Sequence, residues 1–545
     1  MKKQTFLKGS LILMASAIAA KVLGAVFKIP LTNMLGGVGM SYFSCAYSLF
    51  MPFYALIVIG ITSAVAKLVA SSAALGMYSN ALRIRRVALV LFSVAGVPAS
   101  LLLAAFAVPF SIYSVGSTEG AASIIMIAPA VLFGCITAVE RGYYEGMGNM
   151  LPTALSQVAE GFVKVFAGLF LCRFVTDNSE FFMSRFPWVT DIRALAAAAG
   201  ILGVTLSSLG AAAYLWITRL FSGHLPEGEK CLEGRRIIAK KLVREALPVG
   251  ASAVVTNFTA LIDMWTIIGI LSHTGAYNGM FEGVSADEVP RFVYGSFSGI
   301  ALTVFNLVPS VTNMLGKGAL TCIASAREIN DKAGFRRGSI QALLIAEIIA
   351  VPSAVGLGVT APQVLGILFP NQTDETAICI SSLRLLMPAM VCLCVSFPLF
   401  SMLQAIGRAG LPLKIMILGT FVKLAGNLAF IPFWGVDGAA IATSVSYLVI
   451  LAVSVVIYLR ESGLRLEAAP FLKVGYAGAM CGGAAYLASG LFAAYGMIAA
   501  FAAALILGGG TYIAVLFLGF RGEFVHIWSG NRKSPAEKPG RRITF

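Results

Sequence analysis

Residues 141–168 read RGYYEGMGNMLPTALSQVAEGFVKVFAG, and residues 400–426 read FSMLQAIGRAGLPLKIMILGTFVKLAG. The two stretches share one pattern: Gly148 and Gly407 each lie fourteen residues before an FVK triplet, and a proline follows each glycine closely (Pro152 and Pro412). A repeat of 259 residues is far longer than solenoid periods and indicates two similar halves. In membrane proteins, two such halves are typical of transporters that rock around a central site.

The composition identifies a membrane protein. Hydrophobic residues make up 58% of the 545 residues and charged residues only 12%, which exceeds what a soluble core requires. A spanning helix needs about 20 mostly apolar residues. Fourteen such stretches are present, centred near residues 17, 56, 99, 132, 163, 209, 258, 305, 349, 391, 421, 448, 481 and 507. The sequence therefore predicts an all-α integral membrane protein with about fourteen transmembrane helices.

Charge placement supports this topology. With the N-terminus inside, the cytoplasmic segments hold 31 of the 40 Lys and Arg residues and the outer segments hold 5. We expect a multi-pass protein of the cytoplasmic membrane with both termini in the cytoplasm. The net charge of +15 then follows from topology and does not indicate a nucleic-acid partner. The run around Ala17-Ile18-Ala19 resembles a signal-peptide cleavage site, but the apolar segment continues to Phe27, which favours an uncleaved first helix.

The cysteines and histidines predict neither a disulfide framework nor a metal site, because their spacing fits none. No GxxxxGK[ST] phosphate loop is present, so we expect an ion gradient or the membrane potential to supply energy. We expect no bound cofactor beyond a sodium ion or proton as the coupling ion.

Ionisable residues inside the predicted helices carry the functional argument, because a charge at mid-membrane costs at least about 2.5 kcal/mol and normally faces a wet cavity or a partner. Lys21 and Lys28 stand seven residues apart, near one face of the first helix. Glu160 and Lys164 stand four apart and are expected to pair. The remaining charges are Asp263, Glu347, Arg384 and Lys423, where Lys423 occupies the repeat position of Lys164. We assign Glu160, Lys164, Glu347, Arg384 and Lys423 to structural or gating roles.

The oxygen atoms of Asp263, Asn427 and Thr443 are expected to form a sodium or proton site in the second half, since hard cations prefer oxygen ligands. The alternative interpretation is that Asn427 and Thr443 only hydrogen-bond between helices. Glycine pairs at helix ends, such as Gly36 and Gly37, could act as hinges.

Three stretches resemble the stage V sporulation protein B family: KGSLILMASAIAAKVLGAVFKIPLTNMLG (8–36), RGYYEGMGNMLPTALSQ (141–157) and IPFWGVDGAAIATSVSY (431–447). That family belongs to the multidrug/oligosaccharidyl-lipid/polysaccharide exporter superfamily and is similar to lipid II flippases. The resemblance implies two six-helix lobes in a V-shaped bundle, here residues 1–223 and 224–460. Residues 461–545 would add two helices and a basic cytoplasmic tail.

The resemblance also implies a function: a flippase that moves a lipid-linked oligosaccharide across the membrane by alternating access, without catalysing a reaction. The cargo would be an undecaprenyl-pyrophosphate sugar, such as a peptidoglycan, spore-cortex or capsule precursor, and cell-wall synthesis machinery would be a partner. Lipid II flippases carry a basic residue before an LG pair in the first helix and a second one just beyond. Lys21 matches the first position, and the second appears as Lys28, shifted by one residue, so the resemblance implies that both bind the anionic headgroup. The arginine that those flippases place in helix 2 has no counterpart in residues 52–66.

Three other functions are compatible with parts of the sequence. A multidrug exporter of the same superfamily would share the fold but would favour acidic cavity residues. A membrane glycosyltransferase or ligase would need a catalytic constellation on an outer loop, where Glu282, Asp287 and Glu288 are the candidates. A scaffold for cell-wall machinery would not need buried charges.

Overall fold

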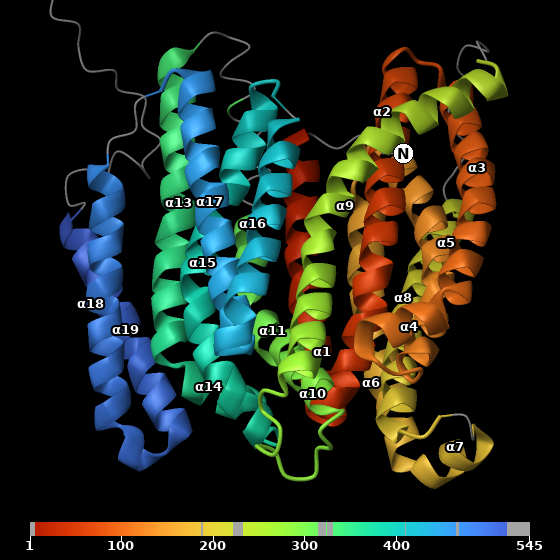
Figure 1. Ribbon diagram of the computed structural model, residues 1–545. Coiled ribbons are helices and arrows are strands. Elements are labelled where there is room, and N and C mark those ends of the chain that lie inside the picture. The colour runs from red at the N-terminus through yellow and green to blue at the C-terminus, as the bar shows by residue number, and fades with distance from the viewer. Residues whose placement is uncertain are drawn as a thin grey trace, which may run out of the picture.

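The computed structural model describes residues 6–186, 189–221, 233–313, 323, 331–408, 410–464 and 468–519. Every secondary-structure element within these ranges is a helix (Figure 1). The predicted all-α membrane fold is therefore confirmed.

The first half contains the helices α1 (Phe6–Tyr54), η1 (Ala55–Ile59), α2 (Gly60–Ala74), α3 (Tyr78–Ala105), α4 (Ala107–Val115), α5 (Gly120–Gly146), α6 (Leu151–Asp177), α7 (Ser179–Arg185) and α8 (Ile192–Leu220). Helix α1 is broken at Gly36, whose φ of 64° and ψ of −175° are not helical. A residue with a Cβ rarely adopts this φ, so glycine permits the break. The break separates the predicted first and second helices.

The second half contains α9 (Arg235–Thr274), α10 (Val289–Ser296), η2 (Phe297–Ala301), α11 (Leu302–Phe305), α13 (Lys332–Val359), α14 (Ala361–Leu368), α15 (Thr373–Ala405), α16 (Leu411–Trp434) and α17 (Val436–Ser462). A hairpin of α18 (Ala469–Leu491), η3 (Ala493–Tyr495) and α19 (Met497–Gly519) follows. It packs against α13 and α14 at the outer side of the second half (Figure 1).

All fourteen predicted helix centres fall within these helices. Among the described residues, nine helices are long and apolar enough to cross a membrane, or ten if the bent pair Val289–Phe305 and Leu307–Asn313 counts as one span. The nine include Ile12–Tyr54 as a single segment, although the break at Gly36 divides it. The count of fourteen spans stays a prediction. Of the predicted domain boundaries, 223/224 lies outside the described residues, as does the tail from 520, whereas 460/461 falls in the last turn of α17.

The repeated hairpin in the sequence is also repeated in the structure. Gly148 ends α5 with a φ of 74°, and Gly407 ends α15 with a φ of 81°. At both sites the glycine N–H bonds to the carbonyl three residues back, and the next N–H bonds to the carbonyl five residues back. This is the Schellman motif, which requires the left-handed conformation that glycine adopts readily. A proline then begins the next helix, α6 or α16, in each copy.

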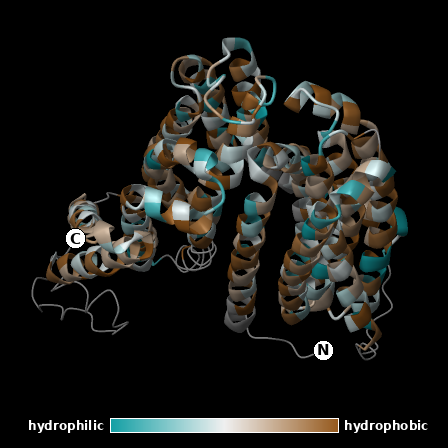
Figure 2. Cartoon of the chain, turned by 90° about the horizontal axis from the view of Figure 1, so that it is seen from below, coloured by the Kyte–Doolittle hydropathy of each residue, from teal (hydrophilic) through white to brown (hydrophobic). Residues whose placement is uncertain are grey.

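The two halves meet along the middle of the molecule. In Figure 1, α9 runs between the orange helices of the first half and the blue helices of the second, and it packs against both α2 and α16. The largest buried hydrophobic cluster also joins the halves, since it includes Phe27 and Leu31 of α1 with Val293 of α10 and Phe297 of η2. Hydrophobic residues cover much of the helical surface (Figure 2), as expected where lipid is the solvent. We call the two halves the N-lobe (α1–α8) and the C-lobe (α9–α17).

Candidate functional site

A cavity of about 630 Å³ lies between the two lobes. Such a volume is within the range of about 300–1,000 Å³ typical of small-ligand pockets. Helices α1 and α6 line it from the N-lobe, and α9, α10, η2, α11, α15, α16 and α17 line it from the C-lobe. Its polar residues without a formal charge are Ser44, Tyr47, Ser48, Asn257, Thr259, Tyr294, Ser298, Asn306, Gln404, Thr443 and Tyr447.

The charged residues of the cavity are three lysines and one aspartate: Lys28, Lys164, Lys423 and Asp263. Together they give the cavity lining a net charge of +2. This excess positive charge in a cavity between the lobes favours an anionic ligand. The two lobes both contribute, since Lys28 and Lys164 belong to the N-lobe and Lys423 to the C-lobe.

Lys28 connects the lobes at the cavity wall. Its ammonium donates to the backbone carbonyl of Ser298 in η2, at 2.9 Å. The hydroxyl groups of Ser44 and Ser298 lie 2.8 Å apart beside it. One ammonium proton is therefore engaged with a neutral carbonyl, and an ammonium group has three donors. Lys28 thus lines the cavity between the lobes, and its binding of an anionic headgroup stays a prediction.

Lys21 lies elsewhere. Its side chain is exposed and is absent from the cavity lining. Seven residues separate it from Lys28, which is two helical turns or about 10.5 Å along the axis. Although the two lysines were predicted to share one face of the helix, only Lys28 lines the cavity.

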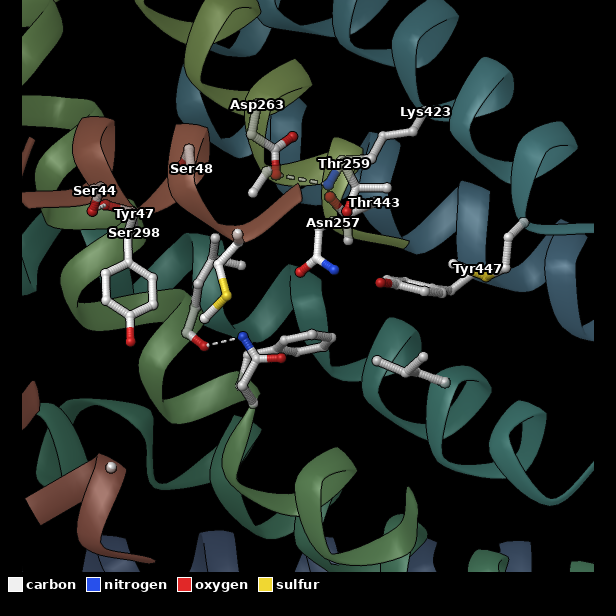
Figure 3. Close-up of a pocket in the computed structure, with 18 of the residues that line it drawn as sticks. Ser44, Tyr47, Ser48, Asn257, Thr259, Asp263, Ser298, Lys423, Thr443 and Tyr447 are labelled. Carbon is white, nitrogen blue, oxygen red and sulfur yellow. Dashed lines mark hydrogen bonds and ion pairs between the residues drawn. The ribbon is translucent and has the colours of Figure 1, made fainter. Parts of the chain in front are cut away.

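The three residues predicted to form an ion site, Asp263, Asn427 and Thr443, come together in the C-lobe. Asp263 of α9 is 2% exposed and accepts two hydrogen bonds, from Lys423 Nζ at 2.7 Å and from Asn427 Nδ2 at 3.1 Å. Asn427 Nδ2 also lies 2.8 Å from Thr266 Oγ1. Thr443 lines the cavity nearby, and its hydroxyl donates to the Ala439 carbonyl. Figure 3 shows Asp263, Lys423 and Thr443 grouped at one side of the cavity.

Lys423 pairs with Asp263. The sequence assigned Lys423 no partner, because Asp263 lies 160 positions earlier in the chain, on α9. Glu160 likewise has an unexpected partner. Arg141 of α5 lies 2.8 Å from it, and no ion pair joins Glu160 to Lys164 among the described residues. The close ion pair of Glu160 is thus made with Arg141 across the hairpin, while its carboxylate still acts electrostatically on Lys164. Lys164 instead points to the cavity, where it interacts with Tyr47.

Glu347 and Arg384 lie away from the cavity lining. Glu347 on α13 is half-buried, and its Oε2 has no hydrogen-bond partner in the part of the chain that the structure describes. Arg384 on α15 is exposed and donates to the Gly358 carbonyl at 3.2 Å. For Glu347 and Arg384, the structural or gating role assigned from the sequence stays a prediction.

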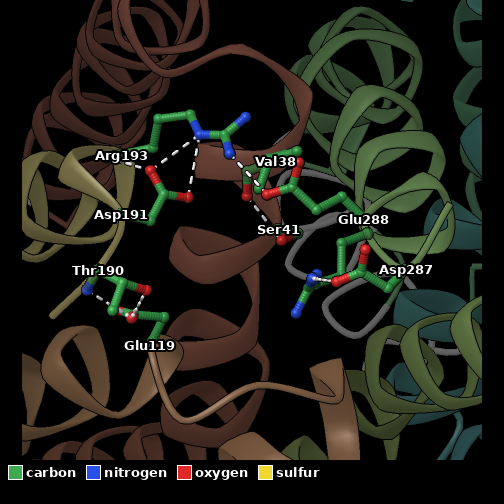
Figure 4. A network of polar contacts seen from close by, with 9 residues as sticks. Val38, Ser41, Glu119, Thr190, Asp191, Arg193, Asp287 and Glu288 are labelled. Atoms are coloured by element: carbon green, nitrogen blue, oxygen red, sulfur yellow. Dashed lines mark hydrogen bonds and ion pairs between the residues drawn. The ribbon is translucent and has the colours of Figure 1, made fainter. Parts of the chain in front are cut away.

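At one end of the cavity, the lobes are held together around the break in α1. Arg193 of α8 lies 2.7 Å from Glu288, which precedes α10, and 2.9 Å from Asp191 (Figure 4). Beside this pair, Gly37 packs so closely on α10 that a Cβ there would lie 2.7 Å from the Phe292 carbonyl oxygen. We call this contact region the α1–α10 gate.

Asp287 belongs to the same loop as Glu288 and pairs with Arg291, at 3.5 Å. A hydrogen bond from the Ser285 side chain lowers the pKa of Asp287, and Arg291 adds to this shift. The carboxylate therefore stays ionised at neutral pH. Two of the three outer-loop carboxylates considered for catalysis, Asp287 and Glu288, thus take part in ion pairs.

At the opposite end, α9 closes on η1 and α2. A Cβ on Gly60 would lie 2.5 Å from the Ala246 carbonyl oxygen, and a Cβ on Gly250 would overlap the Leu56 carbonyl. Lys67 and Glu245 form an exposed ion pair across the same contact, at 2.7 Å. We call this region the α2–α9 gate. The two lobes therefore touch at both the α1–α10 and the α2–α9 contact.

Several cavity residues gave no signal in the sequence. Tyr47, Tyr294 and Tyr447 are neutral residues within apolar helices, where a tyrosine is usually a packing residue. Arg141, the partner of Glu160, lies within α5 and outside the cavity lining, and no signal in the sequence indicated that pairing either. Within the described ranges, no group of three or more His, Cys, Asp and Glu side chains could hold a metal ion, and the seven cysteines described there are free and buried.

Comparison with known proteins gives a consistent result. A family model described as "Polysaccharide biosynthesis protein" matches residues 6–320, which is more than half of the chain, and a model described as "Lipid II flippase MurJ" matches residues 302–507. The stage V sporulation protein B of Bacillus subtilis (strain 168) is 25% identical over 448 residues, 81% of each chain. The lipid II flippase MurJ of the same organism is 21% identical over 473 residues, 84% of this chain and 83% of the relative.

Solved structures share the fold. The lipid II flippase MurJ in an inward closed conformation superposes with a TM-score of 0.68 at 14% identity, covering 94% of this chain and 99% of the other. A multidrug resistance MATE family transporter in an inward-facing conformation gives a TM-score of 0.64 at 14% identity, covering 83% and 98%.

Proposed function

Because this chain belongs to the polysaccharide biosynthesis protein family, we propose that it is a flippase that moves a lipid-linked oligosaccharide across the cytoplasmic membrane by alternating access. The family resemblance inferred from the sequence is confirmed by the matching models and relatives. The protein is a multi-pass membrane protein with the fold of the flippases and exporters it resembles.

The observation that carries this proposal is the positively charged cavity between the lobes. A lipid-linked sugar has an anionic pyrophosphate that hydrocarbon excludes and a polyprenyl chain that hydrocarbon accepts. Lys28 and Lys164 face the cavity from the N-lobe, where they would bind phosphate oxygens through charge-assisted hydrogen bonds. The sugar would contact the neutral polar residues around them, and the lipid chain would stay outside the bundle.

Two gates at opposite ends of the cavity support alternating access. Release of the α2–α9 gate would open the cavity to one side of the membrane, and release of the α1–α10 gate would open it to the other. Both gates rest on close glycine contacts and ion pairs that can separate without unfolding a helix. The cargo can shift the equilibrium between the open states only by as much as its affinities for those states differ.

Orientation, partners and catalysis are also proposals. The excess of Lys and Arg predicted for one side would place both termini in the cytoplasm. The cargo would come from cell-wall, spore or capsule precursor synthesis, whose enzymes are the expected partners. The protein would make and break no covalent bond, and an ion gradient or the membrane potential would drive transport.

Multidrug export is the second candidate, because MATE transporters share the fold. The charge of the cavity favours the flippase. A cavity for amphipathic cations would need unpaired carboxylates, whereas the one carboxylate in this lining, Asp263, already contacts a lysine.

The proposal can be tested in proteoliposomes that contain fluorescent undecaprenyl-pyrophosphoryl sugars. The protein should expose the inner-leaflet fluorophore to an external quencher faster than empty vesicles do. The double variant Lys28→Met/Lys164→Met should lose at least tenfold in rate. Lys414→Met, an exposed lysine on α16, is the matched control and should retain the rate. Transport of amphipathic cations but of no tested glycan, under an imposed ion gradient or potential, would favour the exporter instead.

A further inference from the structure

The oxygen-rich site expected to hold a coupling cation already contains a cation that belongs to the chain. Asp263 and Asn427 come together as expected, but the ammonium of Lys423 occupies the position beside the carboxylate, 2.7 Å from Asp263 Oδ2. Asp263 and Lys423 are 2% and 5% exposed, so solvent screens the pair little.

We propose that Lys423 is the resident counter-cation of Asp263, that it takes the place of a metal ion, and that transport is therefore independent of sodium. This inference deepens the proposed flippase function and rests on it for the transport step. The exchange partner of Lys423 would be the anionic headgroup of the cargo, which would compete with Asp263 for the ammonium.

The charge balance supports this assignment. One carboxylate and one ammonium in contact are neutral together, so a sodium ion added at Asp263 would be repelled by Lys423 at short range. Among the residues that the structure describes, no second carboxylate lines the cavity to compensate that charge. Breaking a buried pair by removing one partner would leave the other as an uncompensated charge, so the pair is expected to be formed whenever the cavity is empty.

The hydrogen bonds around Asp263 are those of a carboxylate surrounded by donors. Asn427 is fully buried and directs its Nδ2 to both Asp263 and Thr266. The Oδ1 atom of Asn427, which a cation would require as a ligand, has no hydrogen-bond partner within the described part of the chain. The orientation of the Asn427 amide follows from this network. Its NH2 group faces Asp263 because a carboxylate accepts hydrogen bonds, whereas a metal ion would need an oxygen atom there. The residues present therefore do not fit a sodium ion while Lys423 is in place.

Removing the lysine should convert the site. Without its ammonium, rotation of the Asn427 amide would direct Oδ1 toward Asp263, and Thr266 and Thr443 would supply two hydroxyl oxygens. These are the oxygen ligands that a hard cation prefers, with a negative charge to balance it. Sodium binding should therefore distinguish the wild-type protein from a variant that lacks Lys423.

The pair is also placed where cargo could act on it. Both Asp263 and Lys423 line the cavity (Figure 3). Helix α9 carries Asp263 and, closer to its N-terminus, Gly250 and Glu245 of the α2–α9 gate. If a phosphate withdrew Lys423, the Asp263 carboxylate would be left without its counter-charge on the helix that forms this gate.

The test measures radioactive sodium binding to the purified full-length protein in detergent, without any glycan. The wild type and Lys423→Arg should bind no sodium above background in exchange with choline. Lys423→Met should gain sodium binding, and the double variant Lys423→Met/Asp263→Asn should lose it again. Lys414→Met removes a lysine from an exposed position of the same helix and should gain none.

Sodium binding by the wild type that disappears in Asp263→Asn would overturn the proposal. A folded Lys423→Met protein that binds no sodium would do the same. If Lys423→Met does not fold, the wild-type flipping rate in choline buffer decides: an unchanged rate supports the proposal, and a fivefold or larger fall on sodium removal overturns it. The sodium-binding experiment needs no cargo, so it can be separated from the test of the flippase function. If the variants bind sodium as expected but the protein flips no glycan, the proposed function is contradicted and the assignment of Lys423 as the counter-cation stands.

Discussion

Arg193 at the start of α8 and Glu288 in the loop before α10 join the two lobes, with Arg193 Nη2 lying 2.7 Å from Glu288 Oε1 (Figure 4). Asp191 holds the same guanidinium at 2.9 Å, so the arginine bridges carboxylates of both lobes. This bridge lies beside the break in α1, where Gly37 contacts α10. The α1–α10 gate therefore combines a close backbone contact, which sets the fit, with an ion pair that can separate.

Removal of this bridge should favour opening of the α1–α10 gate. Because Arg193 is partly exposed, the pair is worth roughly 0.2–1 kcal/mol, which corresponds to at most about a fivefold shift in the gate equilibrium. We expect Arg193→Gln to increase the population of longer distances between spin labels at Glu180→Cys and Glu282→Cys, in a background without reactive cysteines. Arg173→Gln is the control, since Arg173 pairs with Asp177 within α6. A similar shift in the control would show that the bridge does not hold the gate.

The α2–α9 gate should not tolerate a side chain at Gly250. A Cβ there would overlap the Leu56 carbonyl, and backbone atoms cannot rotate away as a side chain can. We expect Gly250→Ala to lengthen the distance between labels at Ser71→Cys and Lys241→Cys and to lower the flipping rate at least tenfold. Gly269→Ala, on the same helix with no atom within 4 Å of the added Cβ, should leave both unchanged. Equal effects of the two substitutions would contradict a gate at this contact.

The two lysines of the first helix should differ in cargo affinity. Lys28 lines the cavity and Lys21 does not. A charged hydrogen bond contributes about 1.5–3 kcal/mol, so Lys28→Met should weaken headgroup binding by roughly tenfold to a hundredfold. Lys21→Met should weaken it less than threefold. Calorimetric titration with a short-chain prenyl-pyrophosphoryl sugar measures both values, and a larger loss in Lys21→Met would restore the assignment made from the sequence.

The stability of the hairpin formed by α5 and α6 should depend on the contact of Glu160 with Arg141 and not on a contact of Glu160 with Lys164. Both members of the Arg141–Glu160 pair are largely buried, and removing one partner of such a pair costs about 3–5 kcal/mol. We expect Glu160→Gln to lower the thermal unfolding midpoint clearly and Lys164→Met to change it little. Thermal unfolding followed by size-exclusion chromatography provides the measurement. A lower midpoint in Lys164→Met than in Glu160→Gln would indicate the i, i+4 pair instead.

The helices and the repeat could be predicted from the sequence because both depend on local chemistry. Long apolar runs become helices in any membrane fold, since each backbone group must find its partner within the segment. The glycines at 148 and 407 mark helix ends for a similar local reason, because a left-handed φ is needed at each. Asp263 was found by the cost of burying a charge, which is also a property of one residue in one helix, although the same argument singled out Lys21 rather than Lys28.

Partners across the fold could not be predicted in this way. Spacing of four residues favoured Glu160 with Lys164, but the hairpin brings Arg141 closer to Glu160. Lys423 had no local partner in the sequence, yet packing of α16 on α9 places it against Asp263. The neutral lining of the cavity, such as Tyr47 and Tyr447, was likewise decided by which helix face turns inward.

The sequence by itself determined that this chain is a duplicated all-α membrane protein of the polysaccharide biosynthesis family, because hydropathy, charge bias and helix-end glycines act within single segments. Only the tertiary structure decided that the expected cation site holds a lysine, that Lys28 and not Lys21 lines the cavity, and that the lobes touch at the α1–α10 and α2–α9 contacts. The physical reason is that ion pairs and cavities depend on distances between helices far apart in the chain, and helix packing alone sets those distances.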